Sequence, residues 1–202
     1  MPSSPVPYPS VIARNVSYDE YLARDFERRV EWVAGDVIEM GDITYDHALL
    51  VKWLLRVLAG FVEANYRGLV LLAPFNMKLP GRPSGRCPDL MFIAESERGR
   101  IREKDLDWPA DLVIEVVSPT SGPTDRGAKF YEYEAGGVRE YWLLDPQRQS
   151  AELYVLVDGR YRAVAPIDGR YASVVLDGFW LDVALLWDLP PVREVEAALG
   201  LR

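Results

Sequence analysis

Residues 109–137 read PADLVIEVVSPTSGPTDRGAKFYEYEAGG, and this stretch decides the fold. The side chains of a strand alternate between its two faces, so Glu115 shares a face with Val113 and Val117. Both faces of residues 112–117 are otherwise apolar, which predicts a strand buried in the centre of a sheet. A carboxylate in such a strand costs free energy unless it has a partner, is protonated or binds a metal.

The sequence around this strand predicts the rest of a core. Thr124 or Asp125 can cap a helix that runs to Ala135 and ends at Gly136-Gly137. The other predicted core elements are a long amphipathic helix over residues 45–66 and strands over residues 69–79, 88–94 and 139–146. The resulting order, α-β-β-β-α-β, is typical of an α+β fold.

Additional elements are predicted on both sides of this core. Ser17 and Glu20 have the spacing of a capping box and open a short helix to about Phe26. Residues 29–40, RVEWVAGDVIEM, form a plausible hairpin. After the core, Asp-Gly pairs at 158–159, 168–169 and 177–178 predict a meander of short strands, followed by a helical turn or two over residues 192–199.

Length and composition predict one domain over residues 17–202, preceded by a loosely held Pro/Ser-rich tail over residues 1–16. A single cysteine, Cys87, suits a reducing compartment. The start of the chain has no secretory pattern, and charged residues interrupt every apolar stretch. We therefore expect a soluble cytoplasmic protein without membrane contact.

The formal net charge of −8 argues against a general nucleic-acid binder, because such proteins present a basic face. Residues 81–104 are nevertheless locally basic, and such a loop either touches phosphate or is a solvated surface. The sequence contains no Gly-rich phosphate loop after a strand and no GxSxG, HExxH or CxxC motif. Dinucleotide, kinase-like, triad-hydrolase and zinc sites therefore lack their usual signatures.

Three ionisable residues are candidates for chemistry. Asp89 follows Pro88 at the start of one predicted strand, Glu115 lies within the next, and Lys129 follows four residues after Asp125 on the same helix face. Neighbouring strands can bring Asp89 and Glu115 together, where a divalent cation would relieve their repulsion. Mg²⁺ prefers one or two carboxylates together with water and phosphate oxygens.

Each of these residues also has a structural explanation. An aspartate after proline is a common turn pair, and Glu115 could reach solvent at a sheet edge or pair with an arginine. Lys129 could lie on the surface or pair with Asp125. The combination of the three residues favours a functional site.

Pro88-Asp89, the run EVVSP over residues 115–119 and the element order together resemble the PD-(D/E)XK nuclease superfamily. More closely, three segments resemble the Uma-two family of restriction-endonuclease-like proteins: RVEWVAGDVIEM, CPDLMFIA and ADLVIEVVSPTSGPTDRGAKFYEYEAGGVREYWLLDP. This resemblance implies a restriction-endonuclease-like core with a mixed central sheet flanked by helices, to which the N-terminal hairpin and the C-terminal β-meander are added.

The resemblance also implies roles for individual residues. Asp89 and Glu115 would be catalytic and ligate Mg²⁺, for which Mn²⁺ can substitute, and the backbone carbonyl of Val116 would add an oxygen. The superfamily lysine is due at Val117, so the sequence departs from the pattern there. Lys129 matches the place to which this lysine has moved in the Uma-two-like group.

Three further residues are implied as helpers. Glu31 matches an acidic position that assists the metal site and is included among the catalytic candidates. His47 lies on a family motif position, and we favour a structural or orienting role for it. Asp125 is a second auxiliary candidate because of its spacing from Lys129.

These roles predict a Mg²⁺-dependent endonuclease that acts on DNA. Two alternatives stay open: a nuclease-fold binding or regulatory protein with weak or no activity, and a metal-dependent phosphoesterase that acts on small nucleotides. Analogy with restriction enzymes also suggests a homodimer.

Overall fold

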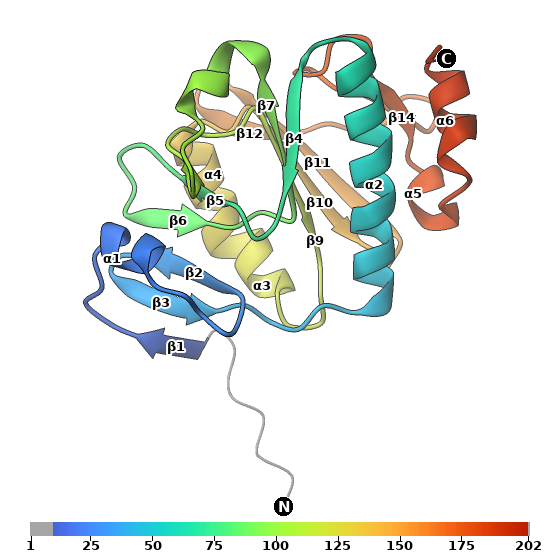
Figure 1. Cartoon of the computed structure of the whole chain (residues 1–202). Helices are drawn as coiled ribbons and strands as arrows, with labels where there is room; N and C mark the ends of the chain where they lie inside the picture. Colours follow the sequence, from blue (N-terminus) through green and yellow to red (C-terminus); the bar gives the residue numbers. More distant parts are fainter. Residues whose placement is uncertain (1–9, 202) are drawn as a thin grey trace, which may run out of the picture.

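The structure is a computed structural model and describes residues 10–201. Within these residues the chain forms two six-stranded sheets, a two-stranded ribbon and helices that pack around them (Figure 1). None of the described helices is long and apolar enough to cross a membrane.

The central sheet carries the strand that contains Glu115. Its order is β12 (Arg160–Ala163), β11 (Ser150–Val157), β10 (Glu140–Asp145), β9 (Leu112–Val116), β7 (Leu90–Ala94) and β4 (Gly68–Leu72). β9 and β10 are parallel, whereas the other neighbouring strands are antiparallel, so the sheet is mixed.

The two faces of the central sheet pack against different layers. The long helix α2 (Tyr45–Ala64) joins Leu112, Ile114 and Val116 in one apolar cluster. The opposite face, which carries Val113 and Val117, packs against helix α4 (Phe130–Gly136) and the second sheet. Glu115 therefore points into the layer between the two sheets, on the face predicted from strand alternation.

The second sheet lies across the lower part of the molecule in Figure 1. Its order is β1 (Ser10–Ala13), β3 (Asp36–Glu39), β2 (Val30–Val33), β6 (Ser84–Arg86), β5 (Asn76–Lys78) and β8 (Asp105–Leu106). The short helix α1 (Tyr18–Ala23) packs on this sheet, and its predicted capping box is present at Ser17. The hairpin predicted over residues 29–40 is also present, as β2 and β3.

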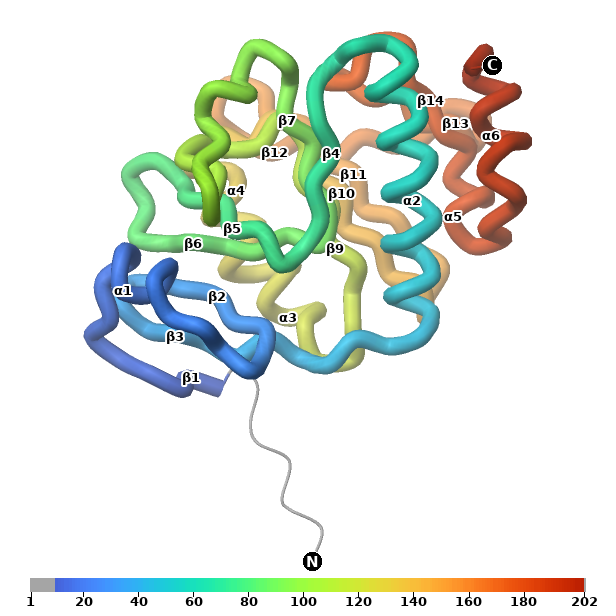
Figure 2. The backbone as a smooth tube through the Cα atoms, viewed as in Figure 1, coloured from blue at the N-terminus to red at the C-terminus, as the bar shows by residue number. Residues whose placement is uncertain are grey.

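The C-terminal part covers the outer side of α2, as the chain path in Figure 2 shows. It consists of the ribbon of β13 (Arg170–Ala172) and β14 (Trp180–Asp182), followed by α5 (Leu185–Asp188) and α6 (Val192–Ala198). Trp53 of α2 donates a hydrogen bond of 2.7 Å from Nε1 to the Pro190 carbonyl, which fixes this segment to the core. The predicted meander is therefore divided, because β11 and β12 extend the central sheet while β13 and β14 form a separate ribbon.

The predicted fold class is confirmed, but several boundaries were wrong. The single strand expected over residues 69–79 is two strands in different sheets, β4 and β5. Pro74 lies between them, and proline cannot donate a hydrogen bond to a ladder, so the pairing of β4 ends before it. This break carries the chain from the central sheet to the second sheet beside the site.

The helix after β9 also begins earlier than predicted. Ser121 precedes α3 (Gly122–Thr124), and the backbone N–H of Asp125 bonds to the Ser121 carbonyl at 3.0 Å. Proline fits this first turn, where its missing N–H has no partner in any case. A π-helical turn (Asp125–Lys129) then connects α3 to α4, and Gly137 ends α4 in the left-handed conformation.

The predicted loose tail is also too long. Residues 1–9 lie outside the described part of the chain, but residues 10–16 are folded onto the second sheet, and the first four of them form one of its strands. Ser10–Ala13 forms β1 on the edge of β3, and Val16 is buried in the cluster beneath α1. Pairing of the backbone and burial of Val16 hold this segment in place.

Candidate active site

Strand pairing brings Asp89 and Glu115 together. β7 and β9 are antiparallel with Leu90 opposite Ile114, so the next pair outward is Asp89 and Glu115. The Val116 backbone N–H donates a hydrogen bond of 2.8 Å to Asp89 Oδ2, which links the two strands at this point. Asp89 is 5% exposed and Glu115 is 2% exposed.

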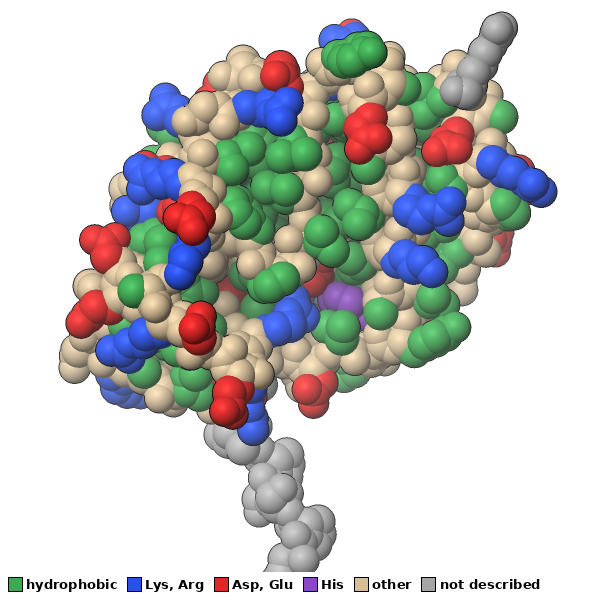
Figure 3. Space-filling view, viewed as in Figure 1, with side chains coloured by type: hydrophobic (Ala, Val, Ile, Leu, Met, Phe, Trp, Pro, Cys, Tyr) green, Lys and Arg blue, Asp and Glu red, His purple; other side chains and the backbone are tan. Residues whose placement is uncertain are grey.

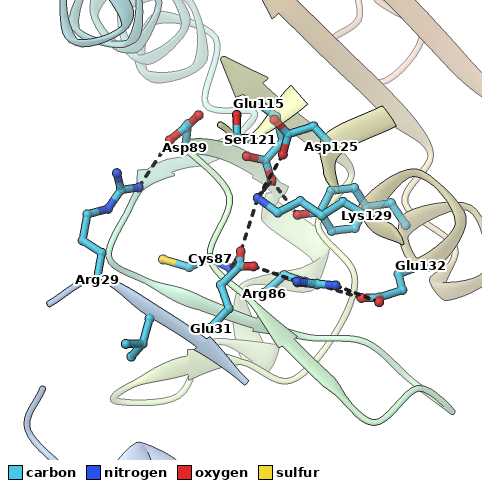
Figure 4. A network of polar contacts seen from close by, with 12 residues as sticks. Arg29, Glu31, Arg86, Cys87, Asp89, Glu115, Ser121, Asp125, Lys129 and Glu132 are labelled. Atoms are coloured by element: carbon cyan, nitrogen blue, oxygen red, sulfur yellow. Dashed lines mark hydrogen bonds and ion pairs between the residues drawn. The ribbon is translucent and has the colours of Figure 1, made fainter. Parts of the chain in front are cut away.

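Lys129 reaches the same place from the π-helical turn. Its Nζ lies 3.0 Å from Glu115 Oε1, 3.3 Å from Glu31 Oε1 and 3.4 Å from Asp125 Oδ1 (Figure 4). A π turn holds more residues than an α turn, so residues four apart, such as Asp125 and Lys129, point in nearly the same direction. The side chain is 2% exposed, so Lys129 is not a surface lysine; its predicted pairing with Asp125 is one of several ion pairs.

Glu31 enters the cluster from β2 of the second sheet. It accepts hydrogen bonds from Arg86 Nη1 at 2.7 Å and from the Cys87 backbone N–H at 3.1 Å. Arg86 is itself held by two hydrogen bonds of 2.8 Å to Glu132 on α4. The second sheet and the α4 helix thus fix the side of the site opposite the central sheet.

His47 and Arg29 both contact Asp89. His47 Nε2 and Arg29 Nη2 lie 3.3 Å and 3.4 Å from Asp89 Oδ1. His47 lies in the first turn of α2, which Thr44 caps, and its buried Nδ1 has no hydrogen-bond partner within the described residues. These contacts are compatible with the orienting role that we predicted for His47.

Tyr133 is a site neighbour that the sequence reasoning missed. Its hydroxyl donates a hydrogen bond of 2.6 Å to Glu115 Oε1, and its side chain is fully buried. The signal was available, because Tyr133 follows Lys129 by four residues on the same helix face. Arg29 and Arg86 were also missed, and their long-range partners leave no local pattern in the sequence.

The structural explanations left open for Glu115 fail. Its strand β9 has a neighbour on each side, so Glu115 is not at a sheet edge. Its charged partner is a lysine, not an arginine.

The locally basic segment 81–104 is largely paired: Arg86 is buried against Glu31, and Arg98 and Arg102 pair with Glu95 and Asp107.

The electrostatics separate the carboxylates into two kinds. Burial alone would raise the pKa of Asp89, but the hydrogen bond from His47 and the charges of His47 and Lys129 hold it below its usual value. For Glu31, burial is likewise outweighed by the charges of Lys129 and Arg86, so its pKa is lowered. Both side chains are therefore ionised at neutral pH.

Glu115 and Asp125 behave in the opposite way. Burial, only partly opposed by the Lys129 ammonium, raises the pKa of Glu115 to about 8. Burial also raises the pKa of Asp125, although its Oδ1 lies 3.4 Å from the Lys129 ammonium. The pKa of Lys129 stays well above its ordinary value despite burial, because three carboxylates surround it. The Lys129 ammonium is thus shared among three carboxyl groups, of which Glu115 is protonated at neutral pH.

A small cavity lies among these groups. Its volume is about 20 Å³, and its lining includes Asp89, Glu115, Val116, Asp125 and Lys129. This volume is close to the space that one water molecule requires. Among the described residues, no three His, Cys, Asp or Glu side chains are arranged as a complete ligand set. The carboxyl groups of Asp89 and Glu115 are nevertheless the kind of oxygen ligand that Mg²⁺ takes, usually one or two together with water.

Comparisons with known proteins identify the family of the chain. Residues 18–184 match the Uma2 family, whose description is "Putative restriction endonuclease". The chain belongs to the Uma2 family. The match covers most of the chain, including the central sheet, all strands of the second sheet except β1, and every residue of the cluster described above.

Two individual proteins are similar to this Uma2 chain. The uncharacterized protein sll1609 of Synechocystis is 24% identical over 159 residues, which cover 77% of this chain and 89% of that protein. A crystal structure described as a putative nuclease belonging to DUF820, from Anabaena variabilis, aligns with a TM-score of 0.71 and 17% identity. The alignment covers 86% of this chain and 98% of the Anabaena chain, which establishes the shared nuclease fold.

Proposed function

We propose that this protein is a divalent-metal-dependent endonuclease that hydrolyses phosphodiester bonds of DNA. The observation that carries the proposal is the convergence of Asp89, Glu115 and Lys129 on one small buried cavity. Membership of the Uma2 family supports the same reaction class.

Asp89, Glu115 and the Val116 carbonyl would hold Mg²⁺ or Mn²⁺. A bound ion of this kind lowers the pKa of a water molecule and offsets negative charge on the phosphate. Asp89 is ready for this role, because it is ionised and His47 fixes its orientation. Glu115 must first release its proton, since its pKa is about 8.

Lys129 can assist the hydrolysis directly. Its ammonium is held by Glu31 and Asp125, so it stays in place when Glu115 turns toward a ligand. From there it can donate a hydrogen bond to the attacking water or to the charge that develops on the phosphate. In the reaction the water oxygen bonds to phosphorus and the bond to the sugar oxygen breaks. The leaving oxygen receives a proton from solvent, and the proton lost by the water returns to solvent.

The proposal is tested with Asp89→Asn, which keeps the shape of the side chain and removes its charge. We expect cleavage of plasmid and of a linear single strand, in Mg²⁺ or Mn²⁺, to fall at least about a hundredfold, the upper range for residues that support metal ligands. Mn²⁺ binding, followed by electron paramagnetic resonance, should weaken in parallel.

Asp111→Asn is the matched control. Asp111 is also buried beside the central sheet, but its oxygens accept from the Ala94 N–H and from Arg139, away from the cavity. This variant should retain wild-type cleavage. Wild-type cleavage by Asp89→Asn, or metal-independent cleavage by the wild type, would contradict the proposal.

The deep burial of the cluster favours one alternative, a phosphoesterase that acts on small nucleotides. Such an enzyme would hydrolyse the p-nitrophenyl ester of thymidine monophosphate rapidly and would leave DNA intact. Steady-state rates on the two substrates distinguish the alternatives.

A further inference from the structure

A larger hollow adjoins the buried cavity. This entrance hollow has a volume of about 820 Å³ and shares Arg29, Met40, Gly41 and Ile43 with the cavity. Thr120, just after β9, lines its other wall. Substrate that reaches Asp89 and Glu115 from this side therefore passes Arg29.

A second hollow lies on the other side of the same arginine. This aromatic hollow has a volume of about 580 Å³ and is lined by Tyr21, Phe26 and Phe75. Arg24 and Lys104 line it as well, together with acidic residues that include Glu27 and Glu103. Arg28 and Arg29 belong to both hollows, so the two meet at this pair.

The Arg29 guanidinium makes few hydrogen bonds for the number of its N–H donors. It is 32% exposed, and within residues 10–201 it makes one hydrogen bond, to Asp89 Oδ1, at a long 3.4 Å. A guanidinium has five N–H donors in a fork that matches phosphate. A cation on Asp89 would compete with Arg29 for that oxygen and leave the fork free to bind an anion.

We propose that Arg29 binds the scissile phosphate of an unpaired nucleic-acid strand that runs from the entrance hollow into the aromatic hollow. The inference rests on the proposed function and specifies its substrate class. Phe26 and Phe75 are half-buried beside basic side chains, whereas Tyr21 is buried behind them, and unpaired bases stack on such rings largely independently of sequence.

The burial of the cluster argues against an intact duplex as the substrate. Asp89 and Glu115 are 5% and 2% exposed, so the target phosphate has to turn inward to reach them, away from a neighbouring strand. An unpaired strand has this freedom. The face in Figure 3 also carries basic and acidic side chains in alternation around a central hydrophobic area, without the continuous basic surface that would suit a duplex.

The test is the binding of a fluorescein-labelled thymidine dodecamer to the full chain, measured by fluorescence anisotropy in Ca²⁺ at several salt concentrations. We expect Arg29→Ala to weaken binding at least about tenfold, as for the loss of a charged hydrogen bond. The slope of log affinity against log salt should fall by about 0.7, the value for one phosphate contact on a single strand. Arg29→Lys should lie between this variant and the wild type.

Arg14→Ala is the control for the loss of one positive charge. Arg14 lies just after β1 of the same sheet, is 69% exposed and pairs with Asp36 outside both hollows. We expect its affinity and salt slope to match the wild type. Thermal unfolding of each variant verifies that the fold is intact.

A parallel assay compares cleavage of the single strand with cleavage of a duplex of the same sequence. We expect the single strand to be cut at least about tenfold faster, and Arg29→Ala to remove most of that rate. Equal cleavage of the duplex, or equal binding by Arg29→Ala and Arg14→Ala, would overturn the inference and leave the proposed function standing. If the wild type cleaves nothing, the proposed function fails while the binding assay still decides whether Arg29 holds a strand. Turnover of the p-nitrophenyl ester without any strand binding also overturns the inference.

Discussion

Two buried glutamates lie on neighbouring parallel strands of the central sheet, and their surroundings are opposite in kind. Glu115 on β9 accepts hydrogen bonds from an ammonium and a phenol and lies near other carboxylates. Glu140 on β10 is fully buried and is surrounded by neutral donors. These are Trp142 Nε1 at 2.7 Å, Tyr171 Oη at 2.9 Å, Ser173 Oγ at 2.8 Å, and the backbone N–H groups of Val174 and Val175 at 2.9 and 3.2 Å.

These two environments show that burial of a carboxylate does not by itself indicate a functional site. Glu140 has a donor for each of its oxygens and anchors residues 171–175 to the central sheet, so its role is structural. Around Glu115, burial and the neighbouring carboxylates of Asp125, Asp89 and Glu31 together raise the pKa. Crowding of carboxyl groups, in addition to burial, is therefore the feature on which the proposed cation site rests.

The largest effect that tests this contrast is on activity. We expect Glu115→Gln to reduce metal-dependent cleavage at least about a hundredfold, because a neutral amide cannot replace a carboxylate ligand. Its thermal stability should not decrease, since Gln replaces a buried carboxyl group that is protonated at neutral pH and has nearly the same shape. Cleavage rates and thermal unfolding, both measured on the purified variant, check this. A variant that is less stable but cleaves normally per folded molecule would show that Glu115, like Glu140, has a structural role.

The converse substitution, Glu140→Gln, should act on stability alone. The amide of Gln has only one oxygen, so its N–H₂ group would face the donors that now bind the second carboxylate oxygen. We expect at least two charged hydrogen bonds to be lost, at about 3 kcal/mol in total. Chemical denaturation measures this loss. Cleavage per folded molecule should equal that of the wild type, and the exposed Glu63 on α2 provides the control as Glu63→Gln. A loss of cleavage without a loss of stability would contradict the structural role.

The effect that is smallest per step is the pH dependence of stability without metal, which is spread over several pH units. The folded chain keeps the Glu115 proton up to pH about 8, whereas the unfolded chain releases it near the ordinary value of 4.5. Between these values the folded state binds more protons, so raising the pH lowers the free energy of unfolding, by up to about 1.4 kcal/mol per pH unit. Denaturation across this pH window measures the free energy of unfolding of the wild type and of Glu115→Gln. We expect this free energy to fall with pH more steeply in the wild type, by the amount given above. Parallel curves would mean that Glu115 is already ionised.

Much of the fold was predictable because local sequence patterns, such as alternation and capping residues, specify it. Alternation around residues 112–117 predicted which face carries Glu115, and capping and turn residues located α1 and the hairpin of β2 and β3. The pairing of Asp89 with Glu115 followed from the order of the strands. The division of residues 69–79 between two sheets was missed, because an apolar run does not reveal which sheet each half joins.

The candidate site was predictable only where its residues lie close in sequence or match a family motif. Arg29 and Arg86 depend on partners more than 40 residues away, and their sequence neighbours do not reveal them. Glu140 illustrates the opposite limit. It stands at the start of an apolar strand much as Glu115 stands within one, and only the three-dimensional donors distinguish their roles.

The π-helical turn has a consequence for how the chain tolerates length changes. One residue more than an α-helix requires is accommodated between Asp125 and Lys129, and Gly127 in this turn has open space beside it. Deleting Gly127 would let an ordinary α-helix form and rotate everything on one side of the deletion by about 100°. Either the lysine would turn away from the carboxylates, or Tyr133 and the rest of α4 would lose their packing. The helix would survive such a one-residue deletion, but the arrangement of charges would not.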